Sequence, residues 1–479
     1  MKKITLCTIC AFFYTCAQAQ WTYEVLWANR GAAEDIDGDI VGGAWSPVPG
    51  SREGVVLDLV SGILRPGFGA AQGTGVINAV HGGQQVGVVQ QDMFAPRYAV
   101  LWSGSPAPIV YLHPAWDASI AYDVYDGVQV GEVTDYGVHT HAAMWYGTPG
   151  SWIDLHPAGH SFSSAVGIFE NTQVGAVDDG AALWHGTAGS YVRLHPAGWA
   201  FSWASAVHGD QQVGATTNFP ENRAALWYGT AASYVNLHPA GHEESTATDV
   251  HSGQQVGYVA NSGNPSAAYW TGSAASYVDL DPFLPQFWFN SEARGIWDDG
   301  DETRIVGTAS NPVGDVFAVM WVRLNDTVPV TSLDVIRGIV SGGGLASLAA
   351  SDDSRLEMKP GIVFSTSQEP VLIKVTGTSP QLNPAMLSFF VESSATGGPS
   401  IRQSIQMYDF DAGVYESVDV QPCTALDETV RVTITDDPGR FIGPSGQVDA
   451  QVGYKATAPV FQFPWRVRLD RVRWIVPGT

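Results

Sequence analysis

The sequence predicts an all-β protein in which a seven-bladed β-propeller precedes a jelly-roll-like β-sandwich. Two observations predict the propeller: short strand-like segments bounded by Gly, Pro, Asn and Ser, and a Val-Gly pair that recurs about every 43 residues. A third observation predicts the sandwich, because the C-terminal third of the chain loses this period but stays rich in alternating strands.

Residues 1–19 have the pattern of a secretory signal peptide. Two lysines precede an apolar stretch from Ile4 to Tyr14, and Ala17-Gln18-Ala19 forms an A-x-A cleavage site. A lipoprotein signal that uses Cys16 is the alternative, although "FYT" is a poor lead-in to a lipid-modified cysteine. We therefore expect a secreted protein, extracellular or at the cell surface, in which Cys423 is the one remaining cysteine.

The composition excludes two classes of partner. The chain has 23 basic and 47 acidic residues, and loss of Lys2 and Lys3 with the signal takes the formal net charge from −24 to −26. Such a surface repels phosphate backbones and anionic lipids. No later apolar run approaches the roughly 18 residues of a membrane helix. We expect no nucleic-acid partner, no membrane insertion and a monomer.

Residues 20–325 carry the repeat. Its Val-Gly glycines are Gly42, Gly87, Gly131, Gly175, Gly214, Gly257 and Gly307. The interval 224–259 shows the four strands of one repeat most clearly, as "AALWYG", "SYVNLHPAG", "ATDVHSG" and "QQVGYV". A sheet of four short strands cannot bury both faces alone, so the sheets are expected to stack as radial blades.

A tryptophan marks one strand of each predicted blade. These residues are Trp45, Trp102, Trp145, Trp184, Trp227, Trp270 and Trp321. Their small apolar lead-ins, such as "AALW" and "AAMW", predict packing between blades. The strand near Trp321 is expected to pair with strands from Ile36 to Gly42, so that the two ends of the array complete one blade and leave no free edge.

The order of these parts resembles the HAF-type extracellular repeats of secreted bacterial proteins, and "THAAMWYG" at 140–147 is the closest copy. In that family an Ile-Asn, a Val-Val-Gly and a His-Ala-Phe-x-Trp segment alternate. The resemblance covers residues 24–325 and implies an extracellular β-propeller without an established activity. This sequence departs from the family by using Leu-His-Pro where a Leu-Gly turn is usual.

Residues 326–331, which include "TVPVT", are expected to link the repeats to a second domain at 332–479. Segments such as "PVLIKVTG", "MLSFFVESS" and "VRVTITD" alternate between Gly, Pro and Asp turns, which predicts a β-sandwich of jelly-roll type. The segments "GLASLAASDDSRL" and "WRVRLDRVRW" resemble parts of the small C-terminal sandwiches of other secreted bacterial repeat proteins.

Four histidines occupy the same "LHPA" slot of successive repeats: His113, His156, His195 and His238. Slots related by rotation around a ring lie too far apart to share a zinc ion, which needs ligands at about 2.0–2.1 Å. The Pro and Gly that follow mark a turn, in which an imidazole can bond a loop carbonyl. Asp281 fills this slot in a fifth copy, which fits a structural role.

The sequence shows no linear catalytic motif. The segment "HEEST" at 242–246 lacks the second histidine of H-E-x-x-H, and no G-x-S-x-G or Walker loop occurs. The acidic segments at 34–39, 298–302 and 351–355 resemble calcium loops, but the first two align with hairpin turns that use Asp and Gly anyway. We expect no catalytic residue and no cofactor, with calcium as the open alternative.

The residues that follow the "LHPA" turns are the candidate ligand-binding residues. They are Trp116, His160, Trp199 and His242, each at the start of a polar loop. Loops that vary on a repeated scaffold are common binding sites, and these side chains could stack on sugar rings. Packing of the same side chains against a neighbouring blade is the structural alternative.

The function that these patterns favour is a secreted, non-enzymatic binding or surface-interaction protein, with polysaccharide or cell-surface glycan as the candidate partner. One alternative is a propeller-based carbohydrate-active hydrolase or lyase, which two raised-pKa carboxyl groups converging in a cleft would favour. The other is a structural envelope or matrix protein, which the lack of any concave site would favour.

Overall fold

A computed structural model describes most of the chain after the predicted signal peptide, which itself lies outside the described residues. The described ranges are 21–27, 30–46, 52–68, 74–92, 94–104, 108–135, 139–349, 354–397, 400–457 and 465–477. The protein is all-β in these ranges, and its helical elements there are 3-10 turns of three or four residues. No helix in them has the length and apolar character of a membrane span.

Six four-stranded antiparallel sheets follow one another along the chain. The first sheet consists of β2 (Gly31–Asp37), β3 (Ile40–Trp45), β4 (Glu53–Asp58) and β5 (Ile63–Phe68). The second consists of β6 (Thr74–His81), β7 (Gln84–Gln90), β8 (Arg97–Trp102) and β9 (Val110–Tyr111). The third consists of β10 (Ala118–Tyr125), β11 (Val128–Asp135), β12 (His139–Trp145) and β13 (Ile153–Asp154). The fourth sheet consists of β14 (Ser163–Phe169), β15 (Thr172–Val177), β16 (Gly180–Trp184) and β17 (Val192–Arg193). The fifth consists of β18 (Phe201–His208), β19 (Gln211–Thr217), β20 (Asn222–Trp227) and β21 (Val235–Asn236). The sixth consists of β22 (Glu244–His251), β23 (Gln254–Asn261), β24 (Asn264–Trp270) and β25 (Val278–Asp279).

A seventh sheet joins the two ends of this series. It consists of β26 (Phe289–Asp298), β27 (Glu302–Ser310), β28 (Val316–Pro329) and the N-terminal strand β1 (Thr22–Val25). Tyr23 lies opposite Trp321 in the β1–β28 ladder. The prediction that the Trp321 strand pairs with residues from Ile36 to Gly42 is therefore wrong, because that segment supplies β2 and β3 of the next sheet.

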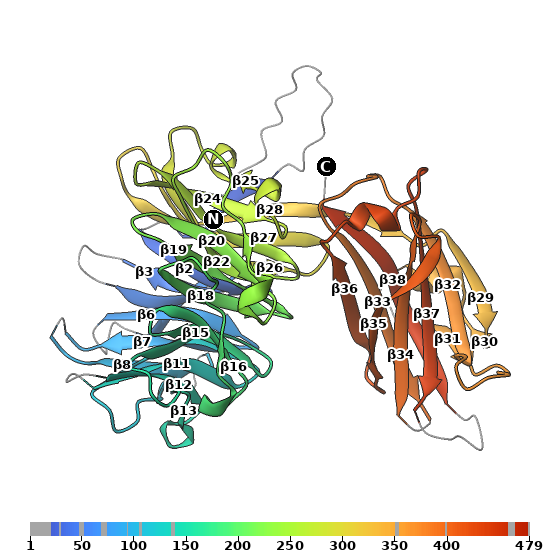
Figure 1. The fold of residues 1–479 in the computed structure, drawn as a ribbon, viewed down its shortest axis with the longest axis horizontal. Coiled ribbons are helices and arrows are strands. Elements are labelled where there is room, and N and C mark those ends of the chain that lie inside the picture. Colours follow the sequence, from blue (N-terminus) through green and yellow to red (C-terminus); the bar gives the residue numbers. More distant parts are fainter. Residues whose placement is uncertain are drawn as a thin grey trace.

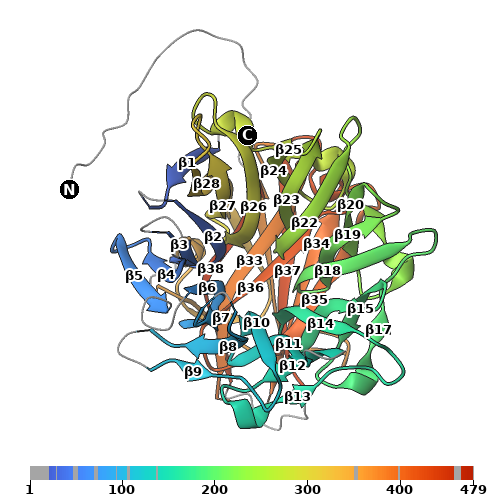
Figure 2. The same ribbon diagram turned by 90° about the vertical axis from the view of Figure 1, so that its left-hand side faces the viewer.

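The seven sheets form a ring in which the first strand of each sheet contacts the first strand of the next. The series of contacts runs through β2, β6, β10, β14, β18, β22 and β26 and returns to β2. Figure 2 shows these strands around the centre of the ring. We refer to the seven sheets together as the ring, and to the strand nearest its centre as the first strand of each sheet.

The repeated glycine is required because the first and second strands approach each other too closely for a side chain. A Cβ atom on Gly131 would lie 1.9 Å from the carbonyl oxygen of Ile120. The same close approach recurs in the other sheets, and in the first sheet the residue concerned is Gly43, whose Cβ would lie 2.1 Å from the Ala32 oxygen. The predicted repeat position Gly42 is thus one residue out of register.

The repeated tryptophans form much of the packing between sheets. Trp145, Trp184, Trp227, Trp270 and Trp321 are fully buried. Trp102 is buried at the equivalent end of β8, where it lies opposite Gln85. Trp45 is different, since it ends the second strand β3, and Leu57, opposite Val41, takes the equivalent place in β4. The prediction that Trp45 belongs to this set is wrong.

The C-terminal part of the chain forms two facing sheets, which we call the C-terminal sheets. One has the order β29 (Ser332–Arg337), β32 (Val371–Thr378), β37 (Gln447–Ala456), β34 (Ile401–Asp409) and β35 (Val414–Cys423). The other has the order β36 (Glu428–Ile434), β33 (Leu387–Thr396), β38 (Arg466–Pro477), β31 (Leu356–Lys359) and β30 (Ile339–Gly342). One apolar cluster that includes Phe389, Tyr454 and Trp474 fills the space between them.

The ring and the C-terminal sheets are connected by a continuous strand pair (Figure 1). Strand β28 runs on from the seventh sheet, and its residues 325–329 pair with 473–477 of β38. Residues 326–329, which were expected to lie in a linker, are therefore part of β28. Arg431 of β36 forms an ion pair with the buried Asp298, so the C-terminal sheets face the end of the ring where the first strands finish.

Candidate functional site

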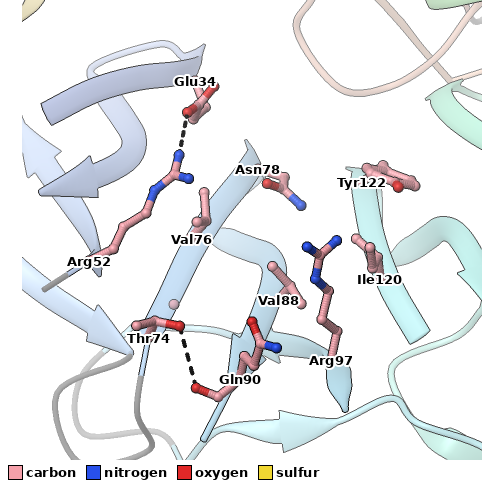
Figure 3. A pocket seen from close by; sticks show the side chains of 11 residues that line it. Glu34, Arg52, Thr74, Val76, Asn78, Val88, Gln90, Arg97, Ile120 and Tyr122 are labelled. Atoms are coloured by element: carbon pink, nitrogen blue, oxygen red, sulfur yellow. Dashed lines mark hydrogen bonds and ion pairs between the residues drawn. The ribbon is translucent and has the colours of Figure 1, made fainter. Parts of the chain in front are cut away.

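A cavity of about 320 Å³ opens at the end of the ring where the first strands begin, opposite the end that faces the C-terminal sheets. We call it the mouth pocket. Its polar lining residues come from the first three sheets and are Glu34, Arg52, Thr74, Asn78, Gln90, Arg97 and Tyr122. Figure 3 shows the arginine side chains on two sides of the pocket, with Val76 and Val88 between them. The "LHPA" loops lead into the first strands, so they lie at this same end of the ring.

Two amide side chains present hydrogen-bond acceptors to the mouth pocket. The Nδ2 of the half-buried Asn78 donates to the Ala121 carbonyl at 2.8 Å, and the Nε2 of Gln90 donates to the Ala95 carbonyl at 2.8 Å. Neither amide oxygen accepts a hydrogen bond from the described part of the chain. The two oxygens are therefore available to a ligand that carries hydroxyl donors.

The charges of the pocket are unevenly paired. Glu34 accepts from Arg52 at 3.4 Å and also binds Arg294, which comes from the seventh sheet. The Arg97 guanidinium is exposed and forms no hydrogen bond or ion pair with the described residues. Tyr122 donates its hydroxyl proton to Glu132 at 3.2 Å, and burial, with Glu132 adding to it, raises the pKa of that phenol.

A smaller cavity of about 120 Å³ lies on the axis of the ring, lined by residues from all seven first strands. Aromatic side chains surround its end nearest the C-terminal sheets. Ring centroids are 4.4 Å apart for His81 and Tyr125, 4.8 Å for Tyr125 and Phe169, and 4.3 Å both for Phe169 and His208 and for His208 and His251. Burial, with the Arg431 charge adding to it, lowers the pKa of His208 to about 4.

Three half-buried aspartates, Asp35, Asp123 and Asp249, line the same cavity. Burial raises the pKa of Asp35 well above its usual range, and the charge of Asp249 adds to this effect. Burial raises the pKa values of Asp123 and Asp249 to about 7. The raised values come from the transfer of a charge out of water, with like charges nearby.

Each of these carboxylates connects two neighbouring sheets. Asp123 accepts from its own neighbour Val124 at 2.7 Å and from Ile168 of the next sheet at 2.8 Å. Asp35 and Asp249 make the same pair of bonds, to Ile36 and Val80 and to Val250 and Ile296. The axial cavity also lies below the roughly 300 Å³ at which ligand pockets begin. We therefore interpret the three aspartates as structural residues that join neighbouring sheets through hydrogen bonds.

The four candidate ligand-binding residues lie at equivalent places, half-buried against an aromatic ring that follows in the chain. Trp116 contacts Trp152 and His141, His160 contacts Tyr191, Trp199 contacts Tyr234, and His242 contacts Tyr277, with ring centroids 5.0–6.3 Å apart. His160 also pairs with Asp178 at 2.6 Å. None of the four lines the mouth pocket, and their ligand-binding role stays a prediction.

The "LHPA" histidines hold their turns as the sequence predicts. In the third copy, the Ser202 hydroxyl accepts from the Ala181 backbone and contacts Nδ1 of His195 at 2.8 Å, while Nε2 lies 3.1 Å from the Trp199 carbonyl. Because the Trp199 carbonyl oxygen can only accept, Nε2 carries the ring proton and donates to it, so Nδ1 of the neutral ring accepts the Ser202 hydroxyl proton. His156 and His238 repeat this arrangement.

The acidic turns are also bonded within the protein. Asp37 accepts from the Gly82 backbone at 2.8 Å, Asp39 pairs with Arg304 at 2.7 Å, and Asp301 pairs with Arg473. Among the described residues, one group of acidic side chains is close enough to hold a cation, namely Glu392, Asp427 and Asp470. Arg355 and Arg471 pair with two of its members. Residues 351–353 of the third acidic segment lie outside the described residues.

A third cavity, of about 580 Å³, lies between the ring and β36. Tyr228 and Thr271 line it from the ring, and Thr433 and Thr435 line it from the C-terminal sheets. Its one lining arginine, Arg440, is held by Asp409 and by Glu416 at 2.9 Å. Among its described lining residues, this cavity therefore offers no unpaired cation.

Comparison with known proteins identifies no family. No family model matches the chain, and no curated protein matches it. Among solved structures, a puromycin hydrolase mutant aligns with a TM-score of 0.46 at 15% identity, over 74% of this chain and 61% of that one. This chain thus spans about three-fifths of the hydrolase.

Two further solved structures concern galactose-containing ligands. An exo-β-1,3-galactanase from Phanerochaete chrysosporium aligns with a TM-score of 0.26 at 11% identity, over 85% of this chain and 97% of that one. A carbohydrate-binding module in complex with β-1,4-galactotriose aligns with a TM-score of 0.21 at 10% identity, over 31% and 90%. Since all these TM-scores lie below 0.5, the likenesses carry no argument about this chain's function.

The mouth pocket was missed by sequence reasoning. Its residues come from strands of three sheets, and amides and arginines of this kind form no linear motif. One signal was present in the sequence, because Arg52 and Arg97 flank the starts of the third strands of successive sheets in a chain with few basic residues. The candidate residues after "LHPA" were found because they stand beside a repeated motif.

Proposed function

We propose that the ring is a seven-bladed β-propeller and that the C-terminal sheets form a jelly-roll-like sandwich. The closed series of first-strand contacts and the β1–β28 ladder support the propeller. We propose the same domain bounds as the sequence predicts, with a signal peptide at 1–19, a repeat domain at 20–325 and a second domain at 332–479. We also propose that the repeats are related to HAF-type repeats and that the protein is extracellular or at the cell surface.

We infer that the protein is a non-enzymatic, monomeric binding protein for carbohydrate and that the mouth pocket is its binding site. The observation that carries this inference is the pair of unengaged amide oxygens of Asn78 and Gln90 in a cavity of about 320 Å³. A saccharide presents many hydroxyl donors, and such donors need fixed acceptors to bind in one orientation.

The same pocket favours binding over hydrolysis. Glycoside hydrolysis generally uses two carboxyl groups about 5 to 9.5 Å apart, one on each side of the scissile bond. Glu34 is the one carboxylate among the described lining residues, and Arg52 and Arg294 both bind it. A hydrolase or lyase remains the alternative, with the axial aspartates as its acidic groups, and an envelope or matrix protein is the second alternative.

A retention assay with a release assay in the same sample tests this proposal. Immobilised polysaccharides are incubated with the protein, and both bound protein and soluble reducing sugar are measured. We expect retention without release. Asn78→Ala should weaken retention about fivefold, since a net hydrogen bond contributes about 1 kcal/mol. Asn264→Ala removes an exposed amide in the hairpin between β23 and β24 as the matched control.

Two outcomes would overturn the proposal. Release of soluble sugar would make the protein an enzyme. Loss of retention in Asn264→Ala but not in Asn78→Ala would place the binding site outside the mouth pocket. Equal melting temperatures of Asn78→Ala and Asn264→Ala would show that a difference in their retention comes from binding and not from folding.

A further inference from the structure

The mouth pocket brings cationic side chains together on a strongly acidic protein. Acidic residues outnumber Lys and Arg by 47 to 23, so an arginine near a cavity usually finds a carboxylate partner. Arg97 is an exception, because its guanidinium is exposed and makes no bond to the described part of the chain. In Figure 3 it extends from β8 into the pocket, toward Asn78 and Tyr122.

The acidic groups around Arg97 are occupied by other partners. Glu34 is held by Arg52 and Arg294, and Arg294 also contacts Glu292 at 3.1 Å. Glu132 accepts the Tyr122 hydroxyl. The Arg97 guanidinium is therefore the one charged group of the described lining that has no hydrogen-bond or ion-pair partner among the described residues.

We propose that the mouth pocket takes a carbohydrate that carries carboxylate groups, that is, a uronic-acid-containing saccharide. Arg97 binds the carboxylate, and the Asn78 and Gln90 amide oxygens accept hydroxyl protons from the same or a neighbouring sugar. This inference rests on the proposed carbohydrate binding and adds the chemical class of the sugar. It does not involve the predicted residues Trp116, His160, Trp199 and His242.

The geometry of the donor set favours a carboxylate over a sulfate. A guanidinium presents a planar pair of N–H donors that matches the two oxygens of a carboxylate. A sulfate group would bring additional acceptor oxygens into a pocket where Asn78, Gln90 and Glu34 present acceptors as well and where the second guanidinium, Arg52, is paired with Glu34. Those oxygens would face each other without a proton between them.

Binding to uronate polymers and to their neutral counterparts tests the proposal. The probes are polygalacturonate and alginate, each beside its carboxyl-reduced form, together with a sulfated galactan. The wild-type protein should bind at least one uronate polymer about tenfold or more tightly than its reduced form, as expected for a hydrogen bond to a charged group. Added salt should narrow this difference, because the contact with Arg97 is exposed.

Substitutions of Arg97 show whether this residue is responsible. Arg97→Gln should remove the preference while leaving binding of the carboxyl-reduced polymer unchanged, and Arg97→Lys should restore only part of it, because lysine lacks the planar pair of donors. Arg402→Gln is the matched control, since Arg402 is an exposed arginine of β34 in the C-terminal sheets. Its preference should equal that of the wild-type protein.

The outcomes separate this inference from the proposed function. Equal binding of the acidic and reduced polymers, or a preference for the sulfated galactan, would overturn the uronate assignment and leave carbohydrate binding standing. Retention of the preference in Arg97→Gln would also overturn it. Binding to none of these polymers and to no neutral polysaccharide would overturn the proposed function itself.

Discussion

The histidines of the "LHPA" turns illustrate how a single residue type can be assigned from its surroundings. A metal ligand leaves a nitrogen lone pair facing a shared centre, whereas both ring nitrogens of His195 are used, by Ser202 and by the Trp199 carbonyl. The repeated sequence already predicted this role, because four equivalent slots around a ring cannot converge on one ion. The serine partner could not be predicted, since it lies on the following first strand.

We expect His195→Ala to lower the free energy of unfolding by about 1 to 2 kcal/mol, because it leaves the Trp199 carbonyl without its donor and the Ser202 hydroxyl proton without its acceptor. His185→Ala removes an exposed histidine of the same sheet and should have little effect. Chemical denaturation of both variants measures the difference. A rise in melting temperature with zinc in the wild-type protein, lost in His195→Ala, would contradict the structural role.

The three axial aspartates, Asp35, Asp123 and Asp249, make the stability of the protein depend on pH. The folded pKa of Asp123, about 7, lies above the ordinary value of 3.8. The folded state therefore binds the proton more tightly, and the stability from this group is fully present below about pH 3.8 and is lost as pH rises from there through 7. Near pH 7 the loss is roughly 0.7 kcal/mol per pH unit for each such carboxyl group.

We expect the melting temperature to be higher at pH 6.5 than at pH 8. Below pH 6.5 the opposite effect of His208 begins, because its folded pKa is lowered to about 4 and stability from it is lost as pH falls. Asp123→Asn should make the dependence between pH 6.5 and 8 shallower, because Asp35 and Asp249 still contribute, and the exposed Asp126→Asn in the same hairpin should leave it unchanged. An unchanged slope in Asp123→Asn would argue against a raised pKa of the Asp123 carboxyl group.

Strand β1 is the element on which closure of the ring depends. It pairs with β28, and the residue before it, Trp21, is 4% exposed. Trp21 packs edge-on against Tyr269 at 5.4 Å and lies under the Arg323 guanidinium at 4.9 Å. The sequence predicted that the two ends of the array would meet in one sheet, but not which N-terminal segment would do so.

The reason for that error is physical. The first sheet lacks a tryptophan in its third strand, where Leu57 takes the equivalent place, so the alignment placed Trp45 there and shifted the assignment of the strands. The repeated glycine was predicted more securely, because the 1.9–2.1 Å approach of a carbonyl oxygen admits no other residue at that position. Steric necessity thus leaves a stronger trace in the sequence than packing does.

Trp21→Ala should lower the free energy of unfolding by about 3 to 5 kcal/mol, as for other buried aromatic side chains. The loss should appear in the transition of the whole ring, since an opened β28 edge exposes the seventh sheet. Tyr23→Ala removes a side chain that is 40% exposed in the same ladder and serves as the control. Calorimetry compares the two, and equal transitions would show that closure does not depend on this contact.

In the whole molecule, the C-terminal sheets cover one end of the ring and leave the mouth pocket at the other. Burial alone would raise the pKa of Asp298, but Arg431 and the hydrogen bonds from Thr303 and Gln254 outweigh it and hold the value at about 2. Gly300 fits the same interface, because a Cβ atom there would lie 2.5 Å from the Phe390 ring. No local pattern could predict this arrangement, since Asp298 and Arg431 are 133 residues apart.

Hydrogen exchange with and without a retained polysaccharide fragment tests the central claim most directly. Binding in the mouth pocket should slow backbone exchange in Thr74–Asn78 of β6 and at the start of β8, while the C-terminal sheets keep their rates. Protection at the loops of Trp116, His160, Trp199 and His242 instead would move the site to the residues predicted from the sequence. Protection confined to the C-terminal sheets would contradict the assignment of binding to the ring.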